Sequence, residues 1–498
     1  MFTADGPNWR CEAAAAPQIA APQPAKGKKD TSKVYTKEEV AKHKTRDSRI
    51  WVTHQGKVYD VSDWADLHPG GAQRLMLAAG GPLEPFWAMY QQHNQPAVRN
   101  ILQQFQIGEL EGGAAASQPV EDPYKGEPER HPILIVRTQK PFNAETPKDI
   151  LAEHLITPNE FFFVRNHLPV PHVDASSYSL RIEGEGLRAL HLSLEDLKTK
   201  FKKHSIIATL QCSGNRRDDM AQVKPIKGLD WDVGAIGTAV WGGVRLRDVL
   251  RAAGMDDEAA NSEVQHIQFE GLDQDESSTH YGASIPIEKA VDPFGDVLLA
   301  YEMNGSPLPA DHGYPVRVVV PGVTGARSVK WLARVVASKE ESSSHWQQKD
   351  YKSFSPNVDW DNVDWSSAPA LQETNVQSAI TEPKPGAKVG AGMDLPVKGY
   401  AFSGGGRPII RVDVSADGGK TWTTAELQRA EQQQRHRAWG WTLWNAEVPV
   451  PADQKGPVQL MAKATDSSYN SQPDTAGPIW NLRGVVNNAW HRVDVDAE

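Results

Sequence analysis

The chain has 498 residues, of which 39% are hydrophobic and 23% charged, and this balance predicts about three globular domains at roughly 150 residues each. A formal net charge of -10 disfavours nucleic acid as a partner, because phosphates are neutralised by a basic surface. No apolar run reaches the roughly 18 residues of a membrane-spanning helix, so no membrane span is expected. The only cysteines, Cys11 and Cys212, exclude a four-cysteine zinc site and disfavour a structural disulfide.

Residues 1–32 are rich in Ala and Pro and lack apolar periodicity, so we expect this segment to be disordered. No secretory signal is evident, since no continuous apolar run follows a basic start. A mitochondrial presequence is not evident either, because Arg10 is the only arginine of the first 30 residues and Asp5 and Glu12 are acidic.

The first folded block is expected over residues 33–111. Thr36, with Glu39 three residues later, has the pattern of a helix N-cap. The stretch 50–64, IWVTHQGKVYDVSDW, predicts a β-hairpin that turns at His54-Gln55-Gly56.

Two histidines of this block have the pattern of haem ligands. His68 opens the tetrapeptide His68-Pro69-Gly70-Gly71, and His93 follows 25 residues after it. Two imidazoles on opposite faces of a crevice would fill both axial sites of a haem iron, which would then carry electrons one at a time. The alternative is that both are turn or surface histidines. Together with the hairpin, the block resembles the cytochrome b5 domain, in which the two matching histidines are the axial ligands. The helical apolar residues expected to line the crevice are Leu75, Leu77, Phe86 and Met89.

Three further segments complete the predicted organisation. Residues 112–130 are rich in Gly, Ala, Pro and charge, which is typical of a flexible linker. Residues 131–370 mix strand-like stretches such as HSIIATLQC with helical ones such as GVRLRDVLRAAG, which indicates an α+β domain. Residues 371–498 predict a small β-sandwich, since strands such as IIRVDVS and WTLWNAEVPV alternate with turns such as Asp-Gly-Gly.

The segment LQCSGNRR at 210–217 indicates a metal site. Cys212 ends a strand-like run, and Arg216 and Arg217 follow closely. A thiolate is a soft metal ligand that cationic neighbours keep deprotonated, and the same arginines would favour an anionic substrate. On spacing alone, a buried and inert thiol is equally compatible with this pattern.

From about residue 130 onward the chain resembles sulfite oxidases. The matching segments occur in the order of that family and are FVRNHLPVP, LQCSGNRR, GLDWDVGAIGTAVWGGV, EMNGSPLPADHGYPVRVVVPG, GARSVKW and QPDTAGPIWNLRG. The resemblance implies a multidomain α+β protein: a cytochrome b5-like domain (33–111), a molybdopterin-binding oxidoreductase domain (131–370) and an immunoglobulin-like dimerisation domain (371–498).

The same resemblance implies residue roles. Cys212 matches the cysteine that ligates molybdenum beside a single pyranopterin. The residues that match the sulfite and sulfate pocket are Arg165, Arg217, Trp231, Tyr351 and Arg483. The residues that match the positions holding the pterin and its phosphate are Phe163, Val164, Arg165, Asn166, His167, Asp273, His312, Arg317, Ser328, Val329 and Lys330.

The expected function is oxidation of sulfite to sulfate at molybdenum, with electrons passing through haem b to cytochrome c. The resemblance also implies a homodimer and the mitochondrial intermembrane space. A nitrate reductase of the same cofactor type is disfavoured, because its haem unit follows the molybdenum part and a flavin domain comes after it. A haem electron carrier with a non-catalytic scaffold is the other alternative, and the intact Cys212 segment argues against it.

Overall fold

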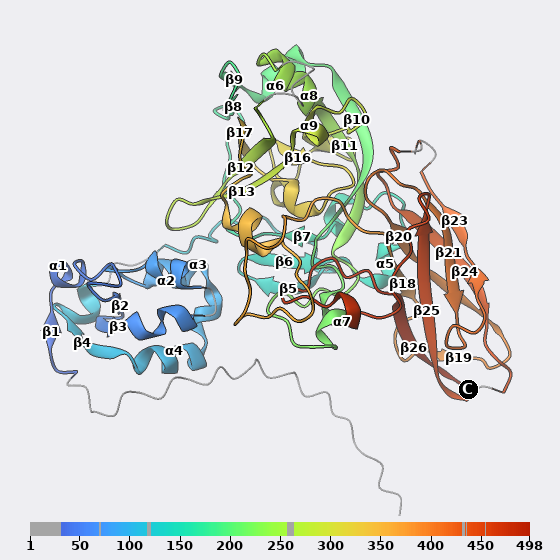
Figure 1. The fold of residues 1–498 in the computed structure, drawn as a ribbon, viewed down its shortest axis with the longest axis horizontal. Helices are drawn as coiled ribbons and strands as arrows, with labels where there is room; N and C mark the ends of the chain where they lie inside the picture. Colours follow the sequence, from blue (N-terminus) through green and yellow to red (C-terminus); the bar gives the residue numbers. More distant parts are fainter. Residues whose placement is uncertain are drawn as a thin grey trace, which may run out of the picture. The chain divides into compact units, whose positions relative to one another are not determined.

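The computed structural model describes residues 31–68, 71–116, 121–255, 263–430, 434, 436–453 and 455–498. The predicted disordered segment lies, up to residue 30, outside the described residues, as do Cys11, Pro69 and Gly70. The chain divides into two compact units, Met1–Asp122 and Pro123–Glu498 (Figure 1). None of the described helices is long and apolar enough to cross a membrane.

Among its described residues, unit 1 pairs a four-stranded sheet, in the order β1-β4-β3-β2, with four short α-helices and three 3-10 helices, η1 Ser62–Leu67, η2 Gln91–Asn94 and η3 Gly113–Ala116. The strands are β1 Val34–Tyr35, β2 Trp51–His54, β3 Lys57–Asp60 and β4 Gln106–Leu110, and the helices are α1 Lys37–Val40, α2 Ala72–Met76, α3 Glu84–Met89 and α4 Pro96–Gln103. The predicted hairpin is confirmed: His54 pairs with Lys57, and Gln55 and Gly56 both have positive φ in the tight turn between them. The predicted N-cap is also confirmed, because the Thr36 side chain accepts a hydrogen bond from the Glu39 amide at 3.1 Å.

The first part of unit 2 contains three sheets and five short helices. A five-stranded sheet contains β10 Lys203–Gln211, β11 Ile236–Arg245, β14 Leu298–Met303, β15 Ser306–Pro307 and β16 Arg317–Val319. A second has the order β13-β12-β17-β8-β9, with β8 Leu180–Gly184, β9 Leu190–Leu192, β12 His266–Gln274, β13 His280–Pro286 and β17 Leu332–Ser338. The smallest joins β5 Ile135–Gln139, β6 Phe142–Glu145 and β7 Val164–Arg165. The helices are α5 Lys148–Leu151, α6 Leu194–Lys200, α7 Arg217–Ala221, α8 Leu246–Ala252 and α9 Ile287–Val291.

The antiparallel pair β10 and β11 positions the predicted metal ligand. Their pairing runs from Lys203 opposite Val244 to Gln211 opposite Ile236. Cys212 therefore leaves the sheet where the pairing ends, and the polar loop that follows leads into α7 at Arg217. The α+β class predicted for this region is confirmed by these mixed sheets and short helices.

The last part of unit 2 is a β-sandwich of two sheets (Figure 1). One has the order β18-β20-β24-β23, with β18 Gln377–Glu382, β20 Asp394–Phe402, β23 Glu426–Gln428 and β24 Thr442–Pro449. The other has the order β19-β26-β25-β21-β22, with β19 Lys388–Val389, β21 Ile409–Ser415, β22 Thr423–Thr424, β25 Gly456–Asp466 and β26 His491–Ala497. Inward residues of both sheets, such as Val397, Val412 and Leu460, form its core. The predicted Asp-Gly-Gly turn joins β21 to β22, with Asp417 accepting from the amides of Lys420 and Thr421.

The segment predicted as a linker, 112–130, is only partly separate from the folded units. Unit 2 begins at Pro123, and Tyr124 is buried there at 6% exposure. Glu127 and Arg130 form an ion pair with both side chains largely buried. The last part of the predicted linker is therefore packed on unit 2, because its aromatic and charged side chains find partners there.

Candidate functional sites

Unit 1 contains a large apolar crevice of about 1270 Å³, and His68 and His93 both line it. Their rings lie 5.9 Å apart between centroids and are almost parallel, at 6°. This separation leaves room for one metal ion between the two rings, since a metal–imidazole bond is about 2 Å long. Leu75, Leu77 and Phe86 line the crevice as predicted. Met89 does not, because its side chain is buried elsewhere at 4% exposure.

Backbone carbonyls fix the orientation of both imidazoles. Nδ1 of His68 donates to the Gly71 carbonyl at 3.3 Å, and Nδ1 of His93 donates to the Tyr90 carbonyl at 2.9 Å. Each ring therefore keeps Nε2 as its unprotonated nitrogen. Burial lowers the pKa of His68 to about 4 and also lowers that of His93, so both are neutral at pH 7. Two neutral, oriented imidazoles in an apolar slot fit a haem with two histidine ligands.

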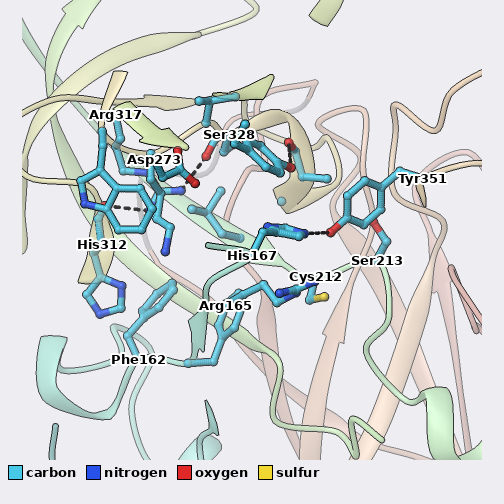
Figure 2. A pocket seen from close by; sticks show the side chains of 18 residues that line it. Phe162, Arg165, His167, Cys212, Ser213, Asp273, His312, Arg317, Ser328 and Tyr351 are labelled. Atoms are coloured by element: carbon cyan, nitrogen blue, oxygen red, sulfur yellow. Dashed lines mark hydrogen bonds between the residues drawn. The ribbon is translucent and has the colours of Figure 1, made fainter. Parts of the chain in front are cut away.

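Unit 2 contains a separate, partly open pocket of about 670 Å³, whose walls combine apolar side chains with charged and polar ones (Figure 2). Segments far apart in the sequence meet around it: β7, the end of β10, β12, β13, β16 and the loops before β17 and after residue 350. Figure 2 shows Cys212 and Tyr351 towards one side of the cavity and Arg317 and His312 towards the other. The residues that line it are Phe162, Phe163, Arg165, His167, Leu210, Cys212, Ser213, Asp273, Tyr281, His312, Arg317, Gly325, Ala326, Ser328, Val329, Lys330, Trp331 and Tyr351.

The thiol of Cys212 is free, and the residue is 6% exposed on the cavity wall. Its amide donates to the Ala235 carbonyl at 3.0 Å, which ties the loop to the chain entering β11. A lone thiol facing this cavity differs from an inert core cysteine, because the cavity gives it room for a metal.

The two arginines after Cys212 have different roles. Arg216 has a left-handed φ of 61° and is 1% exposed; it donates to the carbonyls of Ser378 and Ala489 and pairs with Asp219. It therefore holds the sandwich against the loop. The expectation that Arg216 helps to hold Cys212 as a thiolate was wrong, because its side chain is committed to these partners.

Arg217 lies among the charged groups at the Cys212 side. Its guanidinium donates to the carbonyls of Leu229, at 2.7 Å, and Gly484, at 3.1 Å. Burial lowers its pKa to about 10; the neighbouring cations Arg483 and Arg165 act in the same direction, while Cys212 raises it. Cβ atoms at Gly214, Gly228 and Gly484 would lie 2.4, 3.0 and 2.7 Å from this side chain, so the glycines make room for it.

Tyr351 completes this side of the cavity. Its hydroxyl and His167 Nε2 are 2.6 Å apart and hydrogen-bonded. Burial raises the pKa of Tyr351 to about 12, so the phenol keeps its proton at pH 7. The adjacent Asp350 accepts from Arg483 at 2.8 Å, which brings an arginine of the last block to this site.

Buried polar groups dominate the side of the cavity that lies away from Cys212. Arg317 donates to the carbonyls of His312, Val318 and Ser328, and among the described residues it has no carboxylate ion-pair partner. Burial lowers its pKa to about 9 and that of Lys330 to about 7. Asp273 is 4% exposed, its Oδ1 has no hydrogen-bond partner among the described groups, and burial raises its pKa to about 7. Buried cations and an orphaned carboxylate oxygen fit a polar pterin with a phosphate.

Some predicted site residues lie behind the cavity wall rather than on it. Trp231 is fully buried in the same core cluster as Cys212, and its Nε1 has no hydrogen-bond partner among the described residues. Asn166 is fully buried and accepts from Lys330. Val164 faces a neighbouring cavity. Sequence reasoning missed Ser213 and Tyr281, which line the cavity; Ser213 had the signal of following Cys212 directly.

Comparisons with known proteins cover nearly the whole chain. Residues 36–111 match the family described as "Cytochrome b5-like Heme/Steroid binding domain", residues 167–346 match "Oxidoreductase molybdopterin binding domain", and residues 368–498 match "Mo-co oxidoreductase dimerisation domain". "Sulfite oxidase" of Gallus gallus is 58% identical over 92% of this chain and 99% of the relative. "Sulfite oxidase, mitochondrial" of Homo sapiens is 57% identical over 94% of this chain and 85% of the relative. The crystal structure of the sulfane dehydrogenase SoxCD from Paracoccus pantotrophus is 27% identical, with a TM-score of 0.59 over 76% of this chain and 93% of that chain.

Proposed function

We propose residue roles from one premise: the chain belongs to the sulfite oxidase family. It oxidises sulfite to sulfate with a molybdopterin cofactor in unit 2 and passes the electrons to a b-type haem in unit 1. When bound, the molybdenum cofactor supplies two-electron oxidation chemistry and the haem supplies one-electron transfer. The observation that carries the assignment of residues is the position of one free thiol, Cys212, on the wall of a cavity that Arg165 also lines, with Arg217 interacting electrostatically with Cys212, Arg165 and Arg483.

The cofactor-holding residues belong to the molybdenum site of unit 2 and to the haem site of unit 1. Cys212 would ligate molybdenum, since a thiolate is a soft ligand and this thiol faces the cavity. Phe163, His167, Asp273, His312, Arg317, Ser328, Val329 and Lys330 would hold the pterin and its phosphate. Val164 and Asn166 lie behind the cavity wall and would support these residues. Asn166 would do so by accepting a hydrogen bond from Lys330. His68 and His93 would ligate the haem iron.

Arg165, Arg217 and Arg483 would bind the oxyanion, because guanidinium groups present paired donors and remain charged at pH 7. Sulfite and water give sulfate, two protons and two electrons. Tyr351, held by His167, would donate a hydrogen bond to a substrate oxygen while it keeps its own proton. Trp231, buried behind Cys212, would exclude water from that side.

The wider setting of the enzyme follows from its family and domains. The chain is mitochondrial and forms a homodimer through its last block, residues 368–498. We propose the intermembrane space as the compartment and cytochrome c as the terminal acceptor. A net charge of -10 favours a basic protein partner. The last stretch of unit 1, residues 112–122, is the part of the predicted linker that would serve as the tether that lets the haem unit receive and deliver each electron.

Stopped-flow spectrophotometry of the purified protein tests this function. Sulfite should convert the oxidised haem spectrum to the reduced one, and nitrate should not reoxidise it. Cys212→Ser serves as the matched control, since it should retain the oxidised haem spectrum and lose its response to sulfite. Haem reduction by sulfite in that variant at the wild-type rate would contradict the assignment of Cys212.

A further inference from the structure

A second cavity, of about 650 Å³, adjoins the cofactor cavity in unit 2. The two share Phe162 and His312 as wall residues. The outer wall of the second cavity comes from residues 128–134, the segment where the chain has just entered unit 2. We call this space the antechamber. A group that crosses between the cofactor cavity and the antechamber has to pass Phe162 and His312.

An ion pair forms part of the antechamber wall. Arg130 Nε donates to Asp311 Oδ2 at 2.7 Å, and a second guanidinium nitrogen donates to Oδ1 at 2.9 Å. The two side chains are 13% and 8% exposed, and Glu127 pairs with the same guanidinium at 2.8 Å. The guanidinium also lies 4.2 Å from the centre of the Phe142 ring. A two-pronged, largely buried pair of this kind has a fixed geometry that a single contact lacks.

Asp311 connects this ion pair to the cofactor-holding residues. Its Oδ1 accepts from Asn166 Nδ2 at 3.0 Å, and its carbonyl accepts from Lys330 Nζ at 2.8 Å. Asn166 in turn accepts from Lys330, so the three residues form one closed set of hydrogen bonds. Removal of Arg130 would leave the Asp311 carboxylate buried without its main counter-ion, so Asp311 would no longer be held in place to orient Asn166 and Lys330.

We propose that Arg130 is a positioning residue for the cofactor site: through Asp311 it orients Asn166 and Lys330, and it thereby helps unit 2 to retain the pterin cofactor. Arg130 lies at the end of the connection between the units. Retention of the cofactor is thereby tied to the segment where the chain has just entered unit 2. This inference rests on the proposed location of the cofactor in the cavity beside Cys212.

Release of molybdenum from the full-length holoenzyme tests the proposal. Molybdenum and pterin remaining on the protein are measured over time at raised temperature, with the haem of unit 1 as an internal measure of protein. Arg130→Gln should release molybdenum about ten-fold faster than wild type or more, since a broken buried pair costs several times the 1.4 kcal/mol of a ten-fold change. Asp311→Asn should have a similar effect, and the double variant should add little to either single change. Arg130→Lys should restore part of the retention, because it keeps the charge but not the two-pronged geometry.

Arg137→Gln is the matched control, since Arg137 pairs with the buried Glu145 but lines neither cavity. Equal acceleration by Arg137→Gln would overturn the positioning role, because the effect would then be general destabilisation. Wild-type release from Arg130→Gln would overturn it as well. Lys330→Gln distinguishes the role of Arg130 from the proposed location of the cofactor. Fast release from Lys330→Gln but not from Arg130→Gln overturns the role of Arg130 alone, whereas retention in both also overturns the location of the cofactor.

Discussion

The crevice of unit 1 and the cavity of unit 2 are the proposed sites of the two metal cofactors, and their walls differ in chemistry. The crevice presents mostly apolar side chains and two neutral histidines, with Arg74 as the one cation among the residues that line it. The cavity presents a thiol, buried cations and hydrogen-bonded polar groups. An electron carrier needs an iron whose ligand positions are filled, while an oxidase of a dianion needs an open position beside fixed positive charge. The side chains that line each site therefore match its proposed role: electron transfer in unit 1 and oxidation of an anion in unit 2.

Cys212→Ser should produce the largest effect and separate the two sites. A hydroxyl is a poor substitute for a thiolate ligand of molybdenum, so sulfite oxidation should fall by more than the roughly 10- to 100-fold that outer-shell changes cost. The haem absorption spectrum should be unchanged, because Cys212 belongs to unit 2 and the haem ligands to unit 1. Wild-type turnover of sulfite would place the metal ligand elsewhere.

His68→Ala should give the converse result. Loss of one axial imidazole should remove the haem or its reduction by sulfite, because the remaining ligand, His93, fills only one side of the iron. Sulfite-dependent reduction of a small artificial acceptor should continue near the wild-type rate. If the small-acceptor activity disappeared together with the haem signal, the independence of the two sites would be refuted.

Arg217→Gln should raise the KM for sulfite about 10- to 100-fold, since a hydrogen bond to a charged group contributes roughly 1.5–3 kcal/mol. Arg216→Gln is the neighbouring control. Its side chain bonds to Ser378, Ala489 and Asp219, so this change should lower the stability of the protein and leave the KM nearly unaltered. Steady-state kinetics and thermal unfolding of both variants check this contrast, and an unaltered KM in Arg217→Gln would remove that residue from the pocket.

Acid should weaken unit 2 through His312. Burial lowers the pKa of His312 to about 4. Between pH 6.5 and 4 this imidazole is therefore protonated in the unfolded chain but still neutral in the native state. The contribution of His312 to the free energy of unfolding is therefore fully present above pH 6.5. It decreases as the pH falls, by roughly 3 kcal/mol at pH 4. Denaturant unfolding of cofactor-free protein across this range should show a smaller decline in His312→Gln, and an identical decline would exclude this cause.

Local sequence determined the turns and the helix cap, because their hydrogen bonds and backbone geometry involve only a few neighbouring residues. The turn at Gln55-Gly56, the cap at Thr36 and the Asp-Gly-Gly turn at 417–419 follow from residues that favour one backbone geometry. His68 and Cys212 were recognisable because each lies in a short motif, and His93 because of its spacing after His68. Such features need no knowledge of distant segments, since the interactions that create them are local.

Tertiary structure decided which side chains share a site. Arg216 and Arg217 are adjacent in sequence, yet a left-handed residue at 216 sends one into the sandwich interface and leaves the other among the cations near Cys212. Arg483 reaches the site through Asp350, and Arg130 reaches Asp311 across 181 positions of sequence. The physical reason is that burial and ion pairing depend on which distant segments the folded chain brings together. A local pattern of residue types does not determine which distant segments come into contact.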